Sequence, residues 1–125
     1  MALERFTKDH EYVRLDGDIA TIGITKHAEG QLGDIVFVEL PEVGRKVDVG
    51  EAIAVVESVK AASDVFAPIA GDVVAVNEAL TDSPALVNED AEGQAWFFKI
   101  KIADPASVED LLDRAAYDAF VAENG

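Results

Sequence analysis

Short apolar runs separated by Gly, Pro and Asp occupy most of the chain. Residues 12–15 and 19–24 are rich in apolar side chains and flank Asp16-Gly17-Asp18, which predicts a hairpin with a tight turn. Residues 35–40 are almost continuously apolar, and such a run is typical of a strand buried on both faces. The first third of the chain therefore predicts antiparallel β-structure.

Further runs of similar length continue this pattern toward the C-terminus. We predict strands at residues 52–58, 63–67, 72–77 and 96–102. The stretch 80–93 is polar, with one short strand expected near Leu86. Many short strands with turn signals between them predict an all-β barrel or sandwich.

Two segments change to helical spacing. Thr25 is suited to cap a short helix over 26–32, and Gly33 stands where that helix should stop. Near the C-terminus, Asp104 is an expected N-cap with Pro105 at the first helical position. Apolar residues then recur at helical spacing, which predicts two helical segments or one bent helix packed on the barrel: Val108, Leu111, Leu112, Ala115, Ala116, Ala119 and Phe120.

The composition fits a single domain and narrows its chemistry. Half of the 125 residues are hydrophobic, and the chain has no Cys, so its core needs no disulfides and its own residues supply no thiol. A formal net charge of −15 makes nucleic acid and anionic membranes poor partners and favours a monomer. With no visible leader and no apolar run of roughly 20 residues, we expect a bacterial cytoplasmic protein rather than a mature mitochondrial form.

One lysine occupies a special place in this pattern. The two strands predicted on either side of Val59-Lys60 form a hairpin, so Lys60 projects from a rigid base and its amine can enter another protein's active site. Most exposed lysines are only solvated, but no other of the six lysines lies at such a tip. Glu57 lies three residues before Lys60, while Gly44 and Gly71 are expected at turns that need unusual backbone angles.

The segment around this lysine resembles a known family. Residues 57–64, Glu-Ser-Val-Lys-Ala-Ala-Ser-Asp, are similar to the lipoyl-attachment segment of glycine cleavage H-proteins. Tyr12 stands where that family usually has Trp, and residues 89–94 are less typical. The resemblance extends over nearly the whole chain, through blocks at 8–13, 23–25, 32–41, 67–71, 76–80, 86–88, 96–100, 111–112 and 117–120.

The resemblance implies a fold and a domain plan. The fold is expected to be mainly β, the barrel-sandwich hybrid of lipoyl and biotinyl carriers, with two antiparallel sheets, a short inserted helix and C-terminal helices. The chain, residues 1–125, would be a single lipoyl-carrier domain. Its barrel would span about residues 10–102 and its helical segment about 105–122.

The resemblance also implies a function. A non-catalytic carrier would hold lipoate as an amide on Lys60, which changes the formal net charge from −15 to −15 − 1 = −16. It would carry the aminomethyl group of glycine from a pyridoxal-phosphate glycine decarboxylase to a tetrahydrofolate-dependent aminomethyltransferase. It would pass the reduced dithiol to dihydrolipoamide dehydrogenase, and a lipoate-attaching enzyme would be a further partner.

Five residues besides the lysine have expected roles. In the family, the loaded arm folds back into a cleft, where carboxylates should meet the cationic cargo amine. Glu11 in the opening motif and Asp64, four residues after Lys60, are the arm-cleft candidates. Three residues are candidates for features read by the attaching enzyme: Glu57, Gly71 and Gly44.

Other interpretations require features that differ from those of this chain. A lipoyl domain of a 2-oxoacid dehydrogenase complex would show Asp-Lys-Ala and a Pro- and Ala-rich linker, and a biotin carrier Met-Lys-Met, whereas this chain has Val59-Lys60-Ala61. The intact segment argues against a pure interaction module, while a paralogue that passes lipoate to other proteins stays open. His10 and His27 lack metal-ligand spacing and no nucleophile elbow is visible, so we expect no metal site and no catalytic residue.

Overall fold

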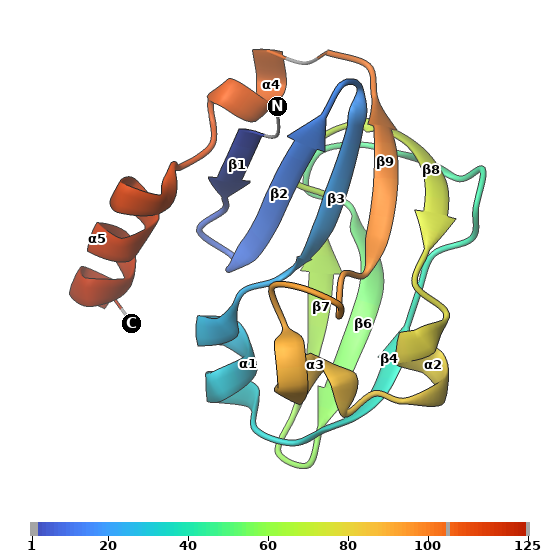
Figure 1. The fold of residues 1–125 in the computed structure, drawn as a ribbon, viewed down its shortest axis with the longest axis vertical. Helices are drawn as coiled ribbons and strands as arrows, with labels where there is room; N and C mark the ends of the chain where they lie inside the picture. Colours follow the sequence, from blue (N-terminus) through green and yellow to red (C-terminus); the bar gives the residue numbers. More distant parts are fainter. Residues whose placement is uncertain (1–2, 105, 125) are drawn as a thin grey trace.

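The fold is mainly β, with two antiparallel sheets and short helices beside them (Figure 1). The computed structural model describes residues 3–104 and 106–124. Within these residues, the larger sheet has six strands, in the order β1 (Leu3–Phe6), β2 (Glu11–Asp16), β3 (Ile19–Ile24), β9 (Phe98–Ile102), β8 (Gly71–Val76) and β5 (Lys46–Val47). The smaller sheet has three, in the order β4 (Ile35–Glu39), β6 (Ala52–Ser58) and β7 (Ala62–Phe66).

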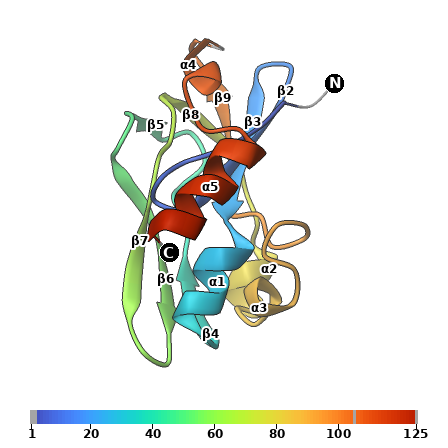
Figure 2. The same cartoon turned by 90° about the vertical axis from the view of Figure 1, so that its left-hand side faces the viewer.

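Helices fill the connections and the C-terminal end. The described residues form α1 (Lys26–Leu32), α2 (Ala79–Asp82), α3 (Leu86–Asp90), α4 (Ala106–Glu109) and α5 (Arg114–Asn124). Figure 2 shows the smaller sheet on one side of the molecule and α1, α2 and α3 beside its lower half, with α5 crossing the near edge. None of the described helices is both long enough and apolar enough to cross a bilayer.

The core lies between the two sheets. Alternate side chains of the central strands point inward, as the period of two dictates for a sheet with one covered face. The larger sheet contributes Ile22, Phe98 and Ile100, and the smaller sheet contributes Val38 and Val56, all of them buried. The expected fold class, mainly β with two antiparallel sheets, is confirmed.

Local sequence signals account for several boundaries. The β2–β3 hairpin turns at Asp-Gly, where Gly17 has a φ of 67°, a left-handed conformation that favours glycine. Helix α1 begins after Thr25, whose side-chain oxygen accepts a hydrogen bond from the Ala28 backbone N–H at 3.2 Å. The helix ends at Gly33, which has a φ of 84°. Both predicted caps of α1 are confirmed.

The expectation that residues 35–40 form a strand buried on both faces is wrong. β4 spans Ile35–Glu39 and buries Ile35 and Val38, but Val36 and Phe37 are 55% and 46% exposed. A shift in the β4–β6 register between Ile35 and Phe37 marks a bulge, which breaks the simple alternation of faces. Apolar residues on an edge strand can face solvent, and composition alone did not reveal that.

The expectation of a short strand near Leu86 is also wrong. Residues 79–82 and 86–90 form α2 and α3 instead. Each short helix buries one large apolar side chain, Leu80 or Val87. Asp82, Glu89 and Asp90 are exposed to solvent, whereas Asn88 is half-buried. With apolar residues this sparse, a single turn of helix satisfies the backbone while covering the core, whereas a strand would need a partner.

The two ends of the chain meet on one edge of the larger sheet. β1, which the sequence pattern did not predict, pairs with β2, and Phe6 exchanges two backbone hydrogen bonds with Leu112 at 2.7 and 2.9 Å. Tyr117 of α5 stacks on the Phe6 ring at 4.8 Å. The C-terminal segment forms two helices rather than one bent helix. The expected cap at Asp104 depends on Pro105, which lies outside the described residues.

Candidate functional site

The β6–β7 hairpin ends in a short, well-bonded turn. The last paired residues are Glu57 and Ala62, and the Ser58 backbone N–H donates to the Ala61 carbonyl at 2.8 Å. The Ser58 hydroxyl accepts from the backbone N–H of Lys60 and of Ala61, each at 3.1 Å. These bonds hold the turn from within, as Ser commonly does. Lys60 is exposed at the tip, where the sequence placed it.

The tip rests on the connection that follows helix α1. The Val59 backbone N–H donates to the Asp34 carbonyl at 3.1 Å. A Cβ placed on Gly33 would lie 3.3 Å from the Cε atom of Lys60, so the lysine stem passes directly over this glycine. The exposed Lys60 side chain on this well-bonded turn fits the attachment of an acyl group to its amine.

The three recognition candidates do not gather at the tip. Glu57 lies next to it, paired in register with Phe37 on one side and Ala62 on the other. Gly44 follows β4, which runs away from the tip, and the Gly44 backbone N–H donates to the Val73 carbonyl at 2.7 Å. Its φ of 96° confirms the expected unusual backbone angle.

Gly71 is not a turn glycine, so the expectation of an unusual backbone angle there is wrong. It begins β8 with extended geometry and pairs with Ile102 and Val47. A Cβ at this position would overlap the backbone carbonyl oxygen of Lys101 and the Ile100 side chain. Close approach of β9 therefore requires glycine here. In Figure 1 the start of β8 lies at the opposite end of the molecule from the β6–β7 turn.

Glu11 is a buried carboxyl that joins the two sheets. It is 2% exposed, and its carboxyl oxygens accept from the Thr7 hydroxyl at 3.0 Å and from the Phe66 backbone N–H at 2.8 Å. Burial raises the pKa of the Glu11 carboxyl from 4.5 to about 7, against the lowering effect of both hydrogen bonds. Glu11 thus changes protonation close to neutral pH.

Asp64 lies on the strand that Glu11 contacts. It is exposed, two residues before Phe66 in β7, and its Cα is paired with that of Val55 in β6. The structure therefore places both arm-cleft candidates along β7, one buried and one in solvent.

A further polar group lies beside Glu11 that the sequence did not predict. The Tyr117 hydroxyl lies 2.8 Å from His10 Nδ1 and 2.7 Å from the Thr25 hydroxyl, and the His10 and His27 rings are 4.7 Å apart. Burial, helped by His27, lowers the pKa of His10. His10 and Tyr117 are 107 positions apart, so no spacing rule could connect them.

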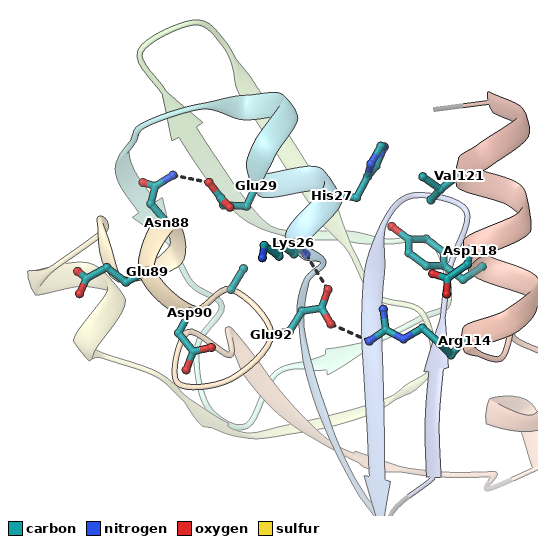
Figure 3. A pocket seen from close by; sticks show the side chains of 12 residues that line it. Lys26, His27, Glu29, Asn88, Glu89, Asp90, Glu92, Arg114, Asp118 and Val121 are labelled. Carbon is teal, nitrogen blue, oxygen red and sulfur yellow. Dashed lines mark hydrogen bonds and ion pairs between the residues drawn. The ribbon is translucent and has the colours of Figure 1, made fainter.

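The hollow drawn in Figure 3 lies beside α1 and does not include the β6–β7 turn. It has a volume of about 550 Å³ and lies between α1, the segment around α3, and α5. Glu92 spans its floor, accepting from the Lys26 backbone N–H and from the Arg114 guanidinium, both at 2.8 Å. Neither Lys60 nor the two arm-cleft candidates line it, so we assign it no role in carrying.

An exposed lysine on a hairpin tip that projects from two packed β-sheets is the arrangement expected of proteins that carry a cofactor on a swinging arm. The profile of the family described as "Glycine cleavage H-protein" matches residues 4–124. The glycine cleavage system H protein of Phenylobacterium zucineum is 65% identical over 120 residues, covering 96% of this chain and 99% of the relative. That of Thermotoga maritima is 53% identical over 123 residues, covering 98% and 99%.

A solved structure agrees with these sequence matches. The crystal structure of a glycine cleavage system H protein from Mycobacterium marinum matches with a TM-score of 0.85 at 38% identity, covering 98% of this chain and 96% of that one. The chain belongs to the glycine cleavage H-protein family. It is the lipoyl shuttle of the glycine cleavage system, and proteins of this family carry lipoate on a lysine. It is a non-catalytic carrier that works with the glycine decarboxylase (P protein), the aminomethyltransferase (T protein) and dihydrolipoamide dehydrogenase (L protein).

Proposed function

We propose that Lys60 is the residue that carries the lipoyl group. The observation that supports this proposal is its place: Lys60 is exposed at the tip of β6–β7, on a turn held by Ser58, with its stem over Gly33. Lys46, Lys99 and Lys101, by contrast, belong to strands of the larger sheet. A rigid base with a flexible end lets the amine enter an enzyme while the fold stays outside.

The chain's own residues present and shelter the attached group. A bound lipoyl group supplies a disulfide that can be reduced and a sulfur that can hold a one-carbon unit. Glu11 and Asp64 provide carboxyl groups along β7 for a cationic amine carried on the arm. An approaching cation lowers the pKa of the Glu11 carboxyl from its value of about 7, so Glu11 gives up its proton when the cargo is near.

The lipoate-attaching enzyme is a partner that must come to the amine itself. It reads Glu57, which lies one residue pair from the turn. Gly44 and Gly71 lie away from the tip, and they serve attachment by keeping the larger sheet and its connections in shape. A side chain added at either position would destabilise the fold, and it would affect recognition by the attaching enzyme only through that change.

The remaining expectations concern the whole chain. We infer that residues 1–125 act as a single lipoyl-carrier domain, with the barrel at about 10–102 and the helical segment at about 105–122. A net charge of −15 favours a monomer through self-repulsion. Bacterial relatives with full-length matches support a cytoplasmic location.

The test is intact-mass spectrometry after incubation with lipoate, ATP and a lipoate ligase. We expect one lipoyl adduct on the wild-type chain and none on Lys60→Ala. Lys46→Ala is the matched control, because Lys46 is also exposed but lies in β5, and it should still take one adduct. An adduct on Lys60→Ala, or none on the folded wild type beside a working positive control, would overturn the assignment.

A further inference from the structure

Asn88 on helix α3 makes three hydrogen bonds to one short segment. Its side-chain oxygen accepts from the Ile35 backbone N–H at 2.8 Å. Its side-chain nitrogen donates to the Gly33 carbonyl at 2.8 Å and to the Glu29 carboxylate at 2.9 Å, the latter drawn in Figure 3. The chemistry fixes the orientation of the amide, because a backbone N–H needs an acceptor and a carbonyl needs a donor.

The segment that Asn88 binds is the one on which the β6–β7 turn, with Lys60, rests. Gly33, whose carbonyl Asn88 binds, lies beneath the Lys60 stem, and a Cβ there would come 3.3 Å from the Lys60 Cε atom. The next residue, Asp34, accepts the hydrogen bond from the Val59 backbone N–H at 3.1 Å. One side chain on α3 therefore fixes the residues on both sides of the carbonyl that anchors the tip.

This segment has little ability to hold itself in place. Gly33 has a φ of 84° and a ψ of −150°, a conformation essentially reserved for glycine, and glycine also populates many others. Ile35 is buried, so without Asn88 its backbone N–H would lack a partner away from water. Removing the amide would let the 33–35 connection relax and take the anchoring carbonyl of Asp34 with it.

We propose that Asn88 is a positioning residue for the carrier lysine. It holds the 33–35 connection so that the β6–β7 turn, and with it the Lys60 amine, is presented in one orientation to the lipoate-attaching enzyme. The proposal rests on the assignment of Lys60 as the attachment residue. It predicts that removing the Asn88 amide slows lipoylation of the folded protein, in addition to any loss of stability.

Asn77 provides a matched comparison within the same part of the chain. Its side-chain nitrogen donates to the Gln94 backbone carbonyl at 2.8 Å, so it also joins two segments through a side chain–backbone bond. That bond does not involve the 33–35 connection. Asn77→Ala therefore removes a bond of the same kind and leaves the hydrogen bonds to the 33–35 connection in place.

The experiment measures three quantities on the unlipoylated full chain for wild type, Asn88→Ala and Asn77→Ala. These are the melting temperature, the hydrogen exchange of the Val59 amide, and kcat/KM for lipoylation by a lipoate ligase with lipoate and ATP. For Asn88→Ala we expect Val59 exchange to be roughly tenfold faster and kcat/KM to be roughly tenfold lower. For Asn77→Ala we expect both to match the wild type.

Each other outcome also decides the question. If Asn88→Ala lowers the melting temperature but leaves Val59 exchange and kcat/KM at wild-type values, Asn88 only stabilises the fold and the proposal is overturned. If that variant does not fold, Asn88→Asp replaces it, since the carboxylate still accepts from Ile35 but cannot donate to Gly33. Failure of wild-type lipoylation would overturn the Lys60 assignment instead, and Val59 exchange would still report whether Asn88 fixes the tip.

Discussion

Two glycines show how differently the two sheets use the absence of a side chain. At Gly71 in the larger sheet, the space is filled by the β9 backbone, which cannot move without breaking the strand ladder. At Gly33, beside the smaller sheet, the space is filled by the flexible end of Lys60. Gly71 lets two strands pack closely, whereas Gly33 leaves room for the side chain of Lys60, which acts outside the fold.

The same division appears in the exposure of apolar side chains. The central strands of the larger sheet bury Ile22, Phe98 and Ile100 completely. Around the lysine tip, Val36 and Val59 are 55% and 68% exposed. Stability and presentation of the lysine are therefore expected to respond to different substitutions.

The largest effect of an added side chain is expected at Gly71. Gly71→Ala should lower the free energy of unfolding by about 2–3 kcal/mol, because its Cβ meets the backbone of Lys101. The folded fraction should still be lipoylated at the wild-type rate. Urea denaturation and intact-mass kinetics measure the two quantities.

Gly30→Ala is the control for this substitution. Gly30 lies inside α1 with open space around its Cα, so alanine should stabilise the protein by up to about 1 kcal/mol. If folded Gly71→Ala is lipoylated slowly, Gly71 takes part in recognition directly and the separation of the two regions fails.

Glu11 connects the two regions, and its substitution should change the pH dependence of stability. The folded protein raises the Glu11 pKa from 4.5 to about 7, so the native state binds more protons than the unfolded state between these values. The Glu11 contribution is present below pH 4.5 and is lost as the pH rises through about 7. Glu11→Gln mimics the neutral acid and should remove this loss.

Urea denaturation of wild type and Glu11→Gln at a series of pH values tests this prediction. The stability of the wild type relative to the variant should fall between pH 4.5 and about 7 and then level off. Parallel curves for the two proteins would show that the carboxyl does not titrate there. Because Gln cannot become a carboxylate for the cationic amine, we also expect slower transfer of the cargo by the lipoylated variant.

The smallest effect is expected at Arg114, the first residue of α5. Arg114 pairs with Glu92 at 2.8 Å and with Glu4 at 3.7 Å, but its side chain is 47% exposed. Arg114→Gln should cost about 0.5 kcal/mol at low salt and less at high salt. Denaturation at two ionic strengths measures this. A loss several times larger and independent of salt would show that α5 depends on Arg114 for packing.

The sequence predicted the parts of the site that depend on neighbouring residues. Asp16-Gly17-Asp18 located the first hairpin, Thr25 and Gly33 bounded α1, and two apolar runs around Lys60 located the tip. It failed where burial depends on distant strands. Val36 and Phe37 were predicted to be buried but are exposed. Helices α2 and α3 were not predicted, because their segment has few apolar residues.

By itself, the sequence determined that a lysine stands at the end of a β-hairpin, because turn chemistry and alternating polarity act over a few residues. Only the tertiary structure decided what that tip rests on. The contact of Asn88 with Gly33 joins positions 55 residues apart, as does that of Glu11 with Phe66. Such contacts depend on how the two sheets and their helices pack, and a side chain's burial and pKa follow from that packing.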